Sequence, residues 1–406
     1  MKKISLFTIA SIILATLLSC NVDSSGDMVS LESPATQRSE LPFLYSDNSG
    51  ELFLSWVDAV SDSDEYRLKY SKWVQGAWSE SREIARSNEW FVNWADYPSI
   101  TAYSGKALAA HVLRKIPGNT YSYNVNISLN KDSTWTEPFP PHNDSTATEH
   151  GFVSMVALNN SEVMATWLDG RRTENREDSE YFDLSKAMTL RSAVINNSGD
   201  VSSRKLLDDS VCDCCQTSMV MTEEGPFVAY RNRTDEEVRD IYYSRYVSGE
   251  WSDPRPVHSD NWKIGACPVN GPRVAAKDSL VVVSWFTKAD NVARVKAAVS
   301  TNYGASFNEP IVVSEDSTSG RVDVAIGKNG VVYVSDLIKD MERYYLSLHE
   351  VDYIKGTVTT RNITEMSGSR RSGFPQMEII DNTLFFAWTE ITDDTLTHVQ
   401  SASLDI

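Results

Sequence analysis

The stretch LFLSWVD, at residues 52–58, decides the fold, because an apolar and aromatic run of the same kind returns about every 50 to 60 residues along the chain. Within each copy, apolar and small residues alternate, which is the period-two pattern of a β-strand. A fixed period of this length that is built from strands predicts a β-propeller with one blade for each repeat. The further copies are LAAHVLR (108–114), VMATWLD (163–169), FVAYRNR (227–233), VVVSWFT (281–287), VYVSDLI (332–338) and LFFAWTE (384–390).

The rest of each repeat also has the pattern of strands. Every copy follows a second strand-like run, and turn residues such as DNSG and GKNG separate the two. Two further strands follow, but the last repeat stops at Ile406 after three strands. The segment MVSLESPAT (28–36) is predicted to supply the missing strand and close the ring, which leaves no free sheet edge. We therefore predict an all-β fold of seven four-stranded blades over residues 38–406, with six blades and a partial sheet as the alternative.

The N-terminus has the three parts of a secretory signal. A cationic MKK and an apolar stretch too short for a comfortable membrane span precede LLSC (17–20), which resembles the bacterial lipobox. The resemblance implies a signal peptide over residues 1–19, a lipidated Cys20 and a segment 20–37 that holds the tether and the closing strand. Asn21 does not match the Asp that retains lipoproteins in the inner membrane, so we expect a bacterial outer-membrane lipoprotein facing the periplasm or the surface. An ordinary signal peptide that happens to carry a Cys is the alternative.

The composition limits the partners. The formal net charge is −18, from 56 acidic and 38 basic residues, whereas a nucleic-acid binder normally carries a basic face. We therefore expect no nucleic-acid partner, and contact with a membrane only through the lipid anchor. We also expect a monomer and no cofactor.

A short motif connects the chain with a known group of propellers. Residues 300–307 read STNYGASF, which resembles the Asp box S-x-D-x-G-x-[ST]-[WF], with Asn302 in the Asp position. The motif lies between the third and fourth strands of its blade, as it does in the sialidase-like β-propellers. Its role is structural, because the polar side chain bonds the turn, the Gly adopts a left-handed conformation and the aromatic residue packs into the blade.

The resemblance implies a glycan or glycoconjugate as the partner, and an exo-glycosidase of the sialidase type if the protein is catalytic. Sialidases use three Arg for the substrate carboxylate, a Tyr–Glu nucleophile pair and an Asp acid/base. Their first Arg lies in an Arg-Ile-Pro motif, and the nearest positional match here, SELPFL (39–44), lacks it. The chain is therefore either an enzyme with a rebuilt site or a non-catalytic propeller that binds a glycan or a protein partner.

Ionisable residues are predicted to gather on one rim of the ring, where first strands begin and second strands end. The turns between these strands, on the opposite face, are short and bland, and function commonly sits on loops held by a rigid scaffold. The catalytic candidates are Asp96, Glu149, His150 and Asp169. The substrate-binding candidates are Trp94, His111, Arg171, Arg231, Arg321 and Arg371. The alternative is that loop ends are polar in any propeller.

Two blades break the repeat at its aromatic position. His111 and Asp336 stand where the five other blades have Trp or Tyr. Local rules are most often broken at functional sites, although a lone His in a strand is more often structural. For both residues, a functional role and a structural role therefore stay open.

Four cysteines form the strangest pattern of the chain. Cys212, Cys214 and Cys215 precede the fourth blade, and Cys267 precedes the fifth, so neighbouring blades bring them together. In an exported protein such a set favours disulfides, and we predict that Cys267 is bridged to one of the other three. Zinc or copper(I) bound by the thiolates, and a reactive thiol pair, are the alternatives.

Overall fold

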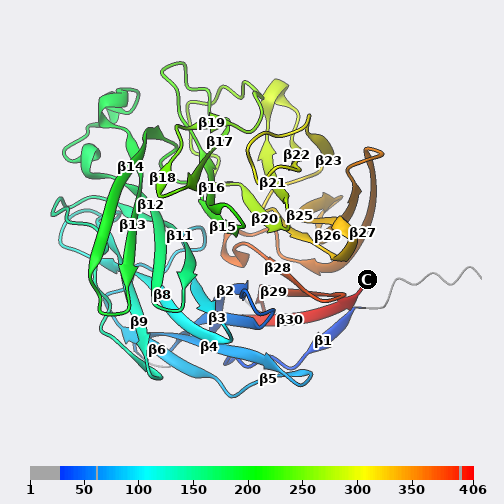
Figure 1. Ribbon diagram of the computed structural model, residues 1–406, viewed down its shortest axis with the longest axis horizontal. Helices are drawn as coiled ribbons and strands as arrows, with labels where there is room; N and C mark the ends of the chain where they lie inside the picture. The colour runs from blue at the N-terminus through cyan, green and yellow to red at the C-terminus, as the bar shows by residue number, and fades with distance from the viewer. Residues whose placement is uncertain (1–27, 61–62, 393–395) are drawn as a thin grey trace, which may run out of the picture.

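The computed structural model describes residues 28–60, 63–392 and 396–406, and these form seven antiparallel sheets around a central axis (Figure 1). The predicted seven-bladed, all-β propeller is confirmed, and the six-bladed alternative is wrong. The only helices in the described residues are single 3₁₀ turns. Among those residues, none of the helices has the length and apolar character that crossing a membrane requires.

The strands run outward from the axis in each blade. Blade 1 contains β2 (Ser39–Ser46), β3 (Leu52–Ala59), β4 (Tyr66–Val74), β5 (Ala77–Trp78) and β6 (Arg82–Ser87). Blade 2 contains β7 (Ile100–Tyr103), β8 (Lys106–Lys115), β9 (Tyr123–Lys131) and β10 (Thr134–Trp135). Blade 3 contains β11 (His150–Asn159), β12 (Glu162–Asp169), β13 (Met188–Asn196) and β14 (Val201–Val211). Blade 4 contains β15 (Ser218–Thr222), β16 (Gly225–Arg231), β17 (Ile241–Val247), β18 (Glu250–Trp251) and β19 (Arg255–Pro256).

The remaining blades follow the same order. Blade 5 contains β20 (Arg273–Lys277), β21 (Leu280–Thr287), β22 (Arg294–Ser300) and β23 (Ile311–Glu315). Blade 6 contains β24 (Asp323–Ile326), β25 (Val332–Asp340), β26 (Arg343–Asp352) and β27 (Thr357–Met366). Blade 7 contains β28 (Gln376–Ile380), β29 (Thr383–Ile391), β30 (Thr397–Asp405) and β1 (Val29–Leu31). The 3₁₀ turns are η1 (Arg171–Thr173), η2 (Asp178–Glu180), η3 (Leu184–Lys186), η4 (Ala289–Asn291), η5 (Lys328–Gly330) and η6 (Arg370–Ser372).

The two ends of the chain close the ring. The N-terminal strand β1 pairs with the C-terminal strand β30, with Val29 opposite Ser403 (Figure 1). Blade 1 is tied to blade 7 as well, since the Val399 amide donates to Ser39 Oγ at 2.9 Å. Closure satisfies strand edges that would otherwise offer free backbone groups to another chain. The predicted closing strand is thus confirmed, whereas Cys20 and the signal segment lie outside the described residues.

Aromatic residues of the second strands pack between the blades. Trp56, Trp167 and Trp285 are almost completely buried, and each indole N–H donates to an Asp carboxylate, at 2.9, 2.9 and 2.6 Å. Such a residue combines a large buried apolar surface with a satisfied polar group, which explains why the repeat needs an aromatic side chain with a polar atom here. The aromatic residue at this position therefore adds apolar surface to the core and also orients an Asp carboxylate through its hydrogen bond.

The two exceptions in the repeat are also buried and bonded. His111 Nδ1 accepts the Ser99 amide at 3.2 Å and lies 2.9 Å from Ser99 Oγ, and burial lowers the pKa of His111 to about 3. Asp336 is bonded to His349 Nε2 at 2.8 Å and to the Ser314 hydroxyl at 2.5 Å. His111 thus bonds within blade 2, whereas Asp336 links β25 to β26 of its own blade and to β23 of blade 5.

The turn 300–307 shows why its residue types are needed. The Ser306 amide donates to Asn302 Oδ1 at 3.0 Å, and the Gly304 amide donates to Ser300 Oγ at 2.9 Å. Gly304 has a φ of +79°, and a Cβ there would lie 2.6 Å from the Phe227 ring. Phe307 packs edge-on against the same ring, so the turn fastens blade 5 to blade 4.

Candidate functional site

A segment before β7 crosses the axis on the rim where the first strands begin. The carbonyl of Ala95 accepts a hydrogen bond of 2.6 Å from Gln216 Nε2 in blade 4, while Trp94 stacks on Phe374 of blade 7 at a centroid distance of 5.8 Å. A single segment from blade 2 thus contacts blades on different sides of the ring. It caps the central channel on the rim that the sequence marked as functional.

The channel beyond this cap forms a large cavity at the centre of the ring. Its volume is about 820 Å³, and the inner strands of all seven blades line it. The lining begins at Ala95, Asp96 and Tyr97 of the cap and ends at the turns that contain Asn48 and Lys328. Small-molecule sites commonly have volumes of about 300 to 1,000 Å³. The cavity therefore has the size of a ligand site. It extends to the face that carries the turns between first and second strands, which the sequence analysis expected to have no function.

A bidentate ion pair lies in the cavity wall. Arg273 Nε and Nη2 each lie 3.2 Å from an oxygen of Asp323, and Arg273 also donates to Gln376 Oε1. The backbone amides of Val324 and Met377 donate to the same carboxylate at 2.9 and 2.8 Å. Four donors therefore hold the Asp323 carboxylate in one orientation.

Glu378 lies in the same wall and has the opposite electrostatic character. The Ser46 hydroxyl donates to Glu378 Oε2 at 2.7 Å. Burial raises the pKa of Glu378 to about 7, with a further contribution from the charge of Asp323. A carboxyl that keeps its proton near neutral pH therefore lies close to a carboxylate fixed by Arg273.

The predicted residues Asp96 and Glu149 meet at a tyrosine that the sequence analysis did not single out. The Tyr123 hydroxyl lies 2.5 Å from Glu149 Oε1 and 3.0 Å from Asp96 Oδ2. Burial raises the pKa of Asp96 to about 7 and that of Glu149 to about 8. A single phenolic hydrogen cannot donate to both oxygens, so the three groups are fully bonded only when one carboxyl is protonated.

Tyr123 was missed because its position gives no signal. It begins the third strand of its blade, where Tyr is common, and only the fold brings it to the cap. Its side chain is 1% exposed and stacks on Phe91 at 4.3 Å, so the hydroxyl faces inward. Among these three residues, only Asp96 lines the cavity.

The structure brings His150, Asp169 and Arg171 together in a second buried cluster. Arg171 donates two hydrogen bonds to Asp169, at 2.6 and 2.8 Å. Burial opposes ionisation of Asp169, but the bonds from Arg171 outweigh it and lower the pKa of this carboxyl to about 2. His150 stacks on His142 at 4.3 Å, and its Nε2 lies 3.0 Å from Asp144 Oδ2.

The predicted arginines of the rim do not converge on one point. Arg231 donates to the carbonyls of Arg239, Asn270 and Phe286 at 2.6 to 3.1 Å. Arg321 donates to Ser372 Oγ and to the carbonyls of Gly368, Ser369 and Gly373. These guanidinium groups therefore fasten loops of neighbouring blades. Arg371, in η6, is half-buried. Burial raises the pKa of Glu40, and the positive charge of Arg371 offsets part of this rise.

Trp94 remains in contact with one predicted arginine. The Arg321 guanidinium lies 5.6 Å from the Trp94 ring, and that of Arg370 lies 5.9 Å from it. The ring is partly exposed. The two cations and Phe374 hold it in place, which keeps the cap across the channel.

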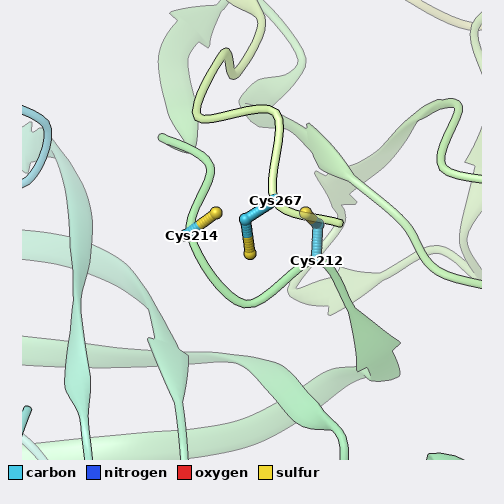
Figure 2. Close-up of side chains that lie close together, drawn as sticks. All are labelled: Cys212, Cys214 and Cys267. Carbon is cyan, nitrogen blue, oxygen red and sulfur yellow. The ribbon is translucent and has the colours of Figure 1, made fainter. Parts of the chain in front are cut away.

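The four cysteines gather on the same rim, between blades 4 and 5. Cys212 and Cys214 follow β14, and Cys267 projects between them from the segment that leads to β20 (Figure 2). The sulfurs of these three residues lie within 4.8 Å of one another, and Cys215 Sγ lies 3.6 Å from Cys212 Sγ. All four are free thiols in the structure. The disulfide predicted for Cys267 therefore has possible partner cysteines nearby, and it stays a prediction.

Comparisons with known proteins agree on the fold. The sequence matches no protein-family model. No curated protein matches it either. Among solved structures, a protein of unknown function from Dyadobacter fermentans is similar with a TM-score of 0.53 and 12% identity, over 95% of this chain and 100% of that chain.

Two further similar structures are glycan-active proteins by their descriptions. The endosialidase of phage phi92 has a TM-score of 0.48 and 10% identity, over 94% of this chain and 69% of that chain. The α-L-arabinanase of Penicillium chrysogenum, complexed with arabinobiose, has a TM-score of 0.45 and 12% identity, over 94% and 98%. At such identities the likeness concerns the fold alone.

Proposed function

We propose that the protein is a glycan-active β-propeller that takes a saccharide into its central cavity. One observation carries the proposal: Glu378, with a pKa raised to about 7, lies in the same cavity wall as the Arg273–Asp323 pair. Glycoside hydrolysis needs a carboxyl that still holds its proton near neutral pH and a second carboxyl that stays ionised. The roles of the individual residues follow from this difference.

Glu378 is the proposed proton donor. Its protonated carboxyl can give its proton to the oxygen that leaves when the glycosidic bond breaks, and water completes the hydrolysis. Asp323 supplies a fixed negative charge for the positive charge that develops on the sugar ring. Arg273 keeps that carboxylate oriented, so Arg273 is a positioning residue.

The charge of the cavity favours a neutral saccharide. Its lining has six carboxyl side chains against three basic ones, and even without Asp96 and Glu378, whose pKa values are raised to about 7, four carboxyls outnumber the three basic groups, so no excess of positive charge attracts an anionic sugar. The acidic members are Asp47, Asp96, Glu223, Asp323, Glu378 and Asp381. The basic members are Arg273, Lys277 and Lys328. The site thus differs from the three-arginine site that the resemblance to sialidases implies.

The test is a panel of fluorogenic glycosides that includes neutral sugars and sialic acid. We expect hydrolysis of a neutral glycoside, and a loss of about 10²- to 10⁴-fold in Glu378→Gln, which is the usual contribution of a general acid. Glu309→Gln is the matched control, because the Glu309 side chain is 92% exposed. Binding of a saccharide without hydrolysis would favour the non-catalytic alternative. If no member of the panel is either bound or hydrolysed, the proposal is refuted.

We also propose that the protein is an outer-membrane lipoprotein held by lipidated Cys20. The support is the LLSC sequence after an apolar run and the absence of Asp at position 21. A lipid anchor followed by a short polar tether would hold the propeller at a membrane surface while leaving its cavity free for a glycan.

A further inference from the structure

The three-sulfur cluster of Cys212, Cys214 and Cys267 has the chemistry of a metal site. Two chain segments that the fold brings together supply the sulfurs, all within 4.8 Å of one another (Figure 2). Thiolates are soft ligands and select soft metal ions. We propose that these three cysteines bind one copper(I) ion on the rim of the propeller. The proposal is independent of the saccharide in the central cavity.

The spacing of the sulfurs fits a shared ion. A metal–sulfur bond is about 2.3 Å long, so three sulfurs spaced evenly around one ion lie about 4.0 Å apart. The observed limit of 4.8 Å needs only a small movement of side chains to meet that requirement. Figure 2 shows Cys267 between Cys212 and Cys214, and because all three sulfurs are close to one another, the two segments bring them to one place.

The number of sulfurs favours copper(I) over zinc. A structural zinc site is tetrahedral and closed, with four protein ligands. The fourth thiol, Cys215, is near Cys212 but does not belong to the group whose sulfurs are all mutually close. Three thiolates without a fourth protein ligand suit a soft monovalent ion better than a closed zinc site.

Fixed charges around the sulfurs prepare the site for thiolates. Arg239, with 0% exposure, donates from Nη1 to Cys212 Sγ at 3.3 Å. Three thiolates and one copper(I) ion carry a net charge of −2, so a buried guanidinium in contact with a sulfur offsets part of it. Tyr181 links the two sides, because its hydroxyl accepts from Arg239 Nη2 at 3.1 Å and lies 3.8 Å from Cys267 Sγ.

The loop that carries two of the sulfurs is held from outside. Asp213, between Cys212 and Cys214, accepts a hydrogen bond of 2.8 Å from Arg176 Nη2 and lies 3.5 Å from Arg233 Nη1. The Cys212 amide also donates to the carbonyl of Arg231 at 2.9 Å. Partners of this kind orient metal ligands before the ion arrives.

The cluster has one open side. Cys212 is buried and Cys214 is half-buried, whereas Cys267 is exposed. An ion can therefore reach the site from solvent next to Cys267 and be held against Cys212. The copper site and a disulfide of Cys267 exclude each other, so a single set of measurements decides between them.

The experiment uses the full chain with Cys20→Ser, which leaves the four rim cysteines as the only thiols. Reduced protein is titrated anaerobically with copper(I) in the presence of a chromogenic copper(I) chelator, and X-ray absorption counts the sulfur neighbours. We expect one copper(I) per chain with three sulfur ligands. Cys267→Ser should weaken the affinity for copper(I) at least about 100-fold. Loss of a group that only contacts a metal ligand already weakens metal binding by up to about 100-fold, and Cys267 is itself a proposed ligand.

Cys215→Ser is the matched control, since it removes a neighbouring thiol outside the three-sulfur group and should leave copper(I) binding intact. Thermal unfolding of each variant shows whether it folds, and Cys214→Ser gives a second test if Cys267→Ser does not. The proposal is overturned by unchanged affinity in folded Cys267→Ser, by the absence of copper(I) binding, or by a preference for zinc with four sulfurs. Mass mapping of unreduced protein that finds Cys267 in a disulfide also overturns it.

Discussion

Arg273, the first residue of β20, forms a two-point ion pair with Asp323, the first residue of β24, across the boundary between blades 5 and 6. Both side chains are largely buried in the wall of the central cavity. Because the two residues come from neighbouring inner strands, the pair holds the wall together where the proposed saccharide would lie.

Replacing Arg273 with Met should destabilise the fold by about 3 to 5 kcal/mol, because it leaves the Asp323 charge buried and unpaired. Chemical denaturation measures the change. The double variant Arg273→Met with Asp323→Asn should recover part of the loss, since it removes the charge as well. Arg343→Ala is the control: its partner Glu365 and Arg343 itself are mostly exposed, and such surface pairs contribute about 0 to 1 kcal/mol. Equal losses in Arg273→Met and Arg343→Ala would contradict the assignment.

Glu378 should make stability depend on pH in a defined window. Its pKa rises from an ordinary value of 4.5 to about 7 on folding, so between these values the folded state binds more protons than the unfolded state. Stability therefore falls as pH rises from about 4.5 to about 7, and this contribution is constant above that range. Unfolding by urea at a series of pH values should show a smaller decline in Glu378→Gln than in the parent. The same slope in both proteins would show that Glu378 titrates normally.

Gly151→Ala should disturb the cap through Asp96. A Cβ at position 151 would lie 2.0 Å from Asp96 Oδ2 and 2.8 Å from the Tyr123 ring, and neither group can move without losing its bonds. We expect a destabilisation of about 1 to 3 kcal/mol, as for other overpacked sites, measured by denaturation. Gly265→Ala, whose nearest neighbour would be a Phe182 ring atom at 3.2 Å, should cost less. A tolerated Gly151→Ala would mean that the cap is loosely held.

The two faces of the propeller can be separated by substitution. If the saccharide enters the cavity from the turns between first and second strands, Lys328→Glu at the mouth should change kcat/KM or affinity by several-fold, and Arg371→Lys on the rim should have little effect. A site on the rim, as the sequence analysis expected, gives the reverse result. Melting temperatures that stay close to the parent value exclude a loss of folding in both variants.

Cys20→Ser should release the protein from the membrane fraction, because it removes the residue to which the lipid would be attached. Fractionation followed by immunoblotting measures the distribution. Ser19→Ala is the control, as it changes the neighbouring residue and keeps the Cys. Continued membrane association of Cys20→Ser would refute the anchor.

The repeat in the sequence was sufficient to predict seven blades and the closing strand. Alternation of apolar residues is a local property of each strand, and a blade can bury its faces only against neighbouring blades. The same argument placed Cys267 beside Cys212 and Cys214, because residues that lead into adjacent inner strands must be neighbours in a ring.

The location of the cavity was decided only by the tertiary structure. Nothing in the local pattern indicates that Trp94 and Ala95 reach across the axis to Phe374 and Gln216, since these contacts join blades that are far apart in the sequence. The role of each charged residue was open for the same reason: a guanidinium bonded to carbonyls and one paired with a carboxylate look identical in a sequence. Periodic packing is written into the order of the residues, whereas the cap, the cavity and the pKa values depend on which distant side chains finally meet.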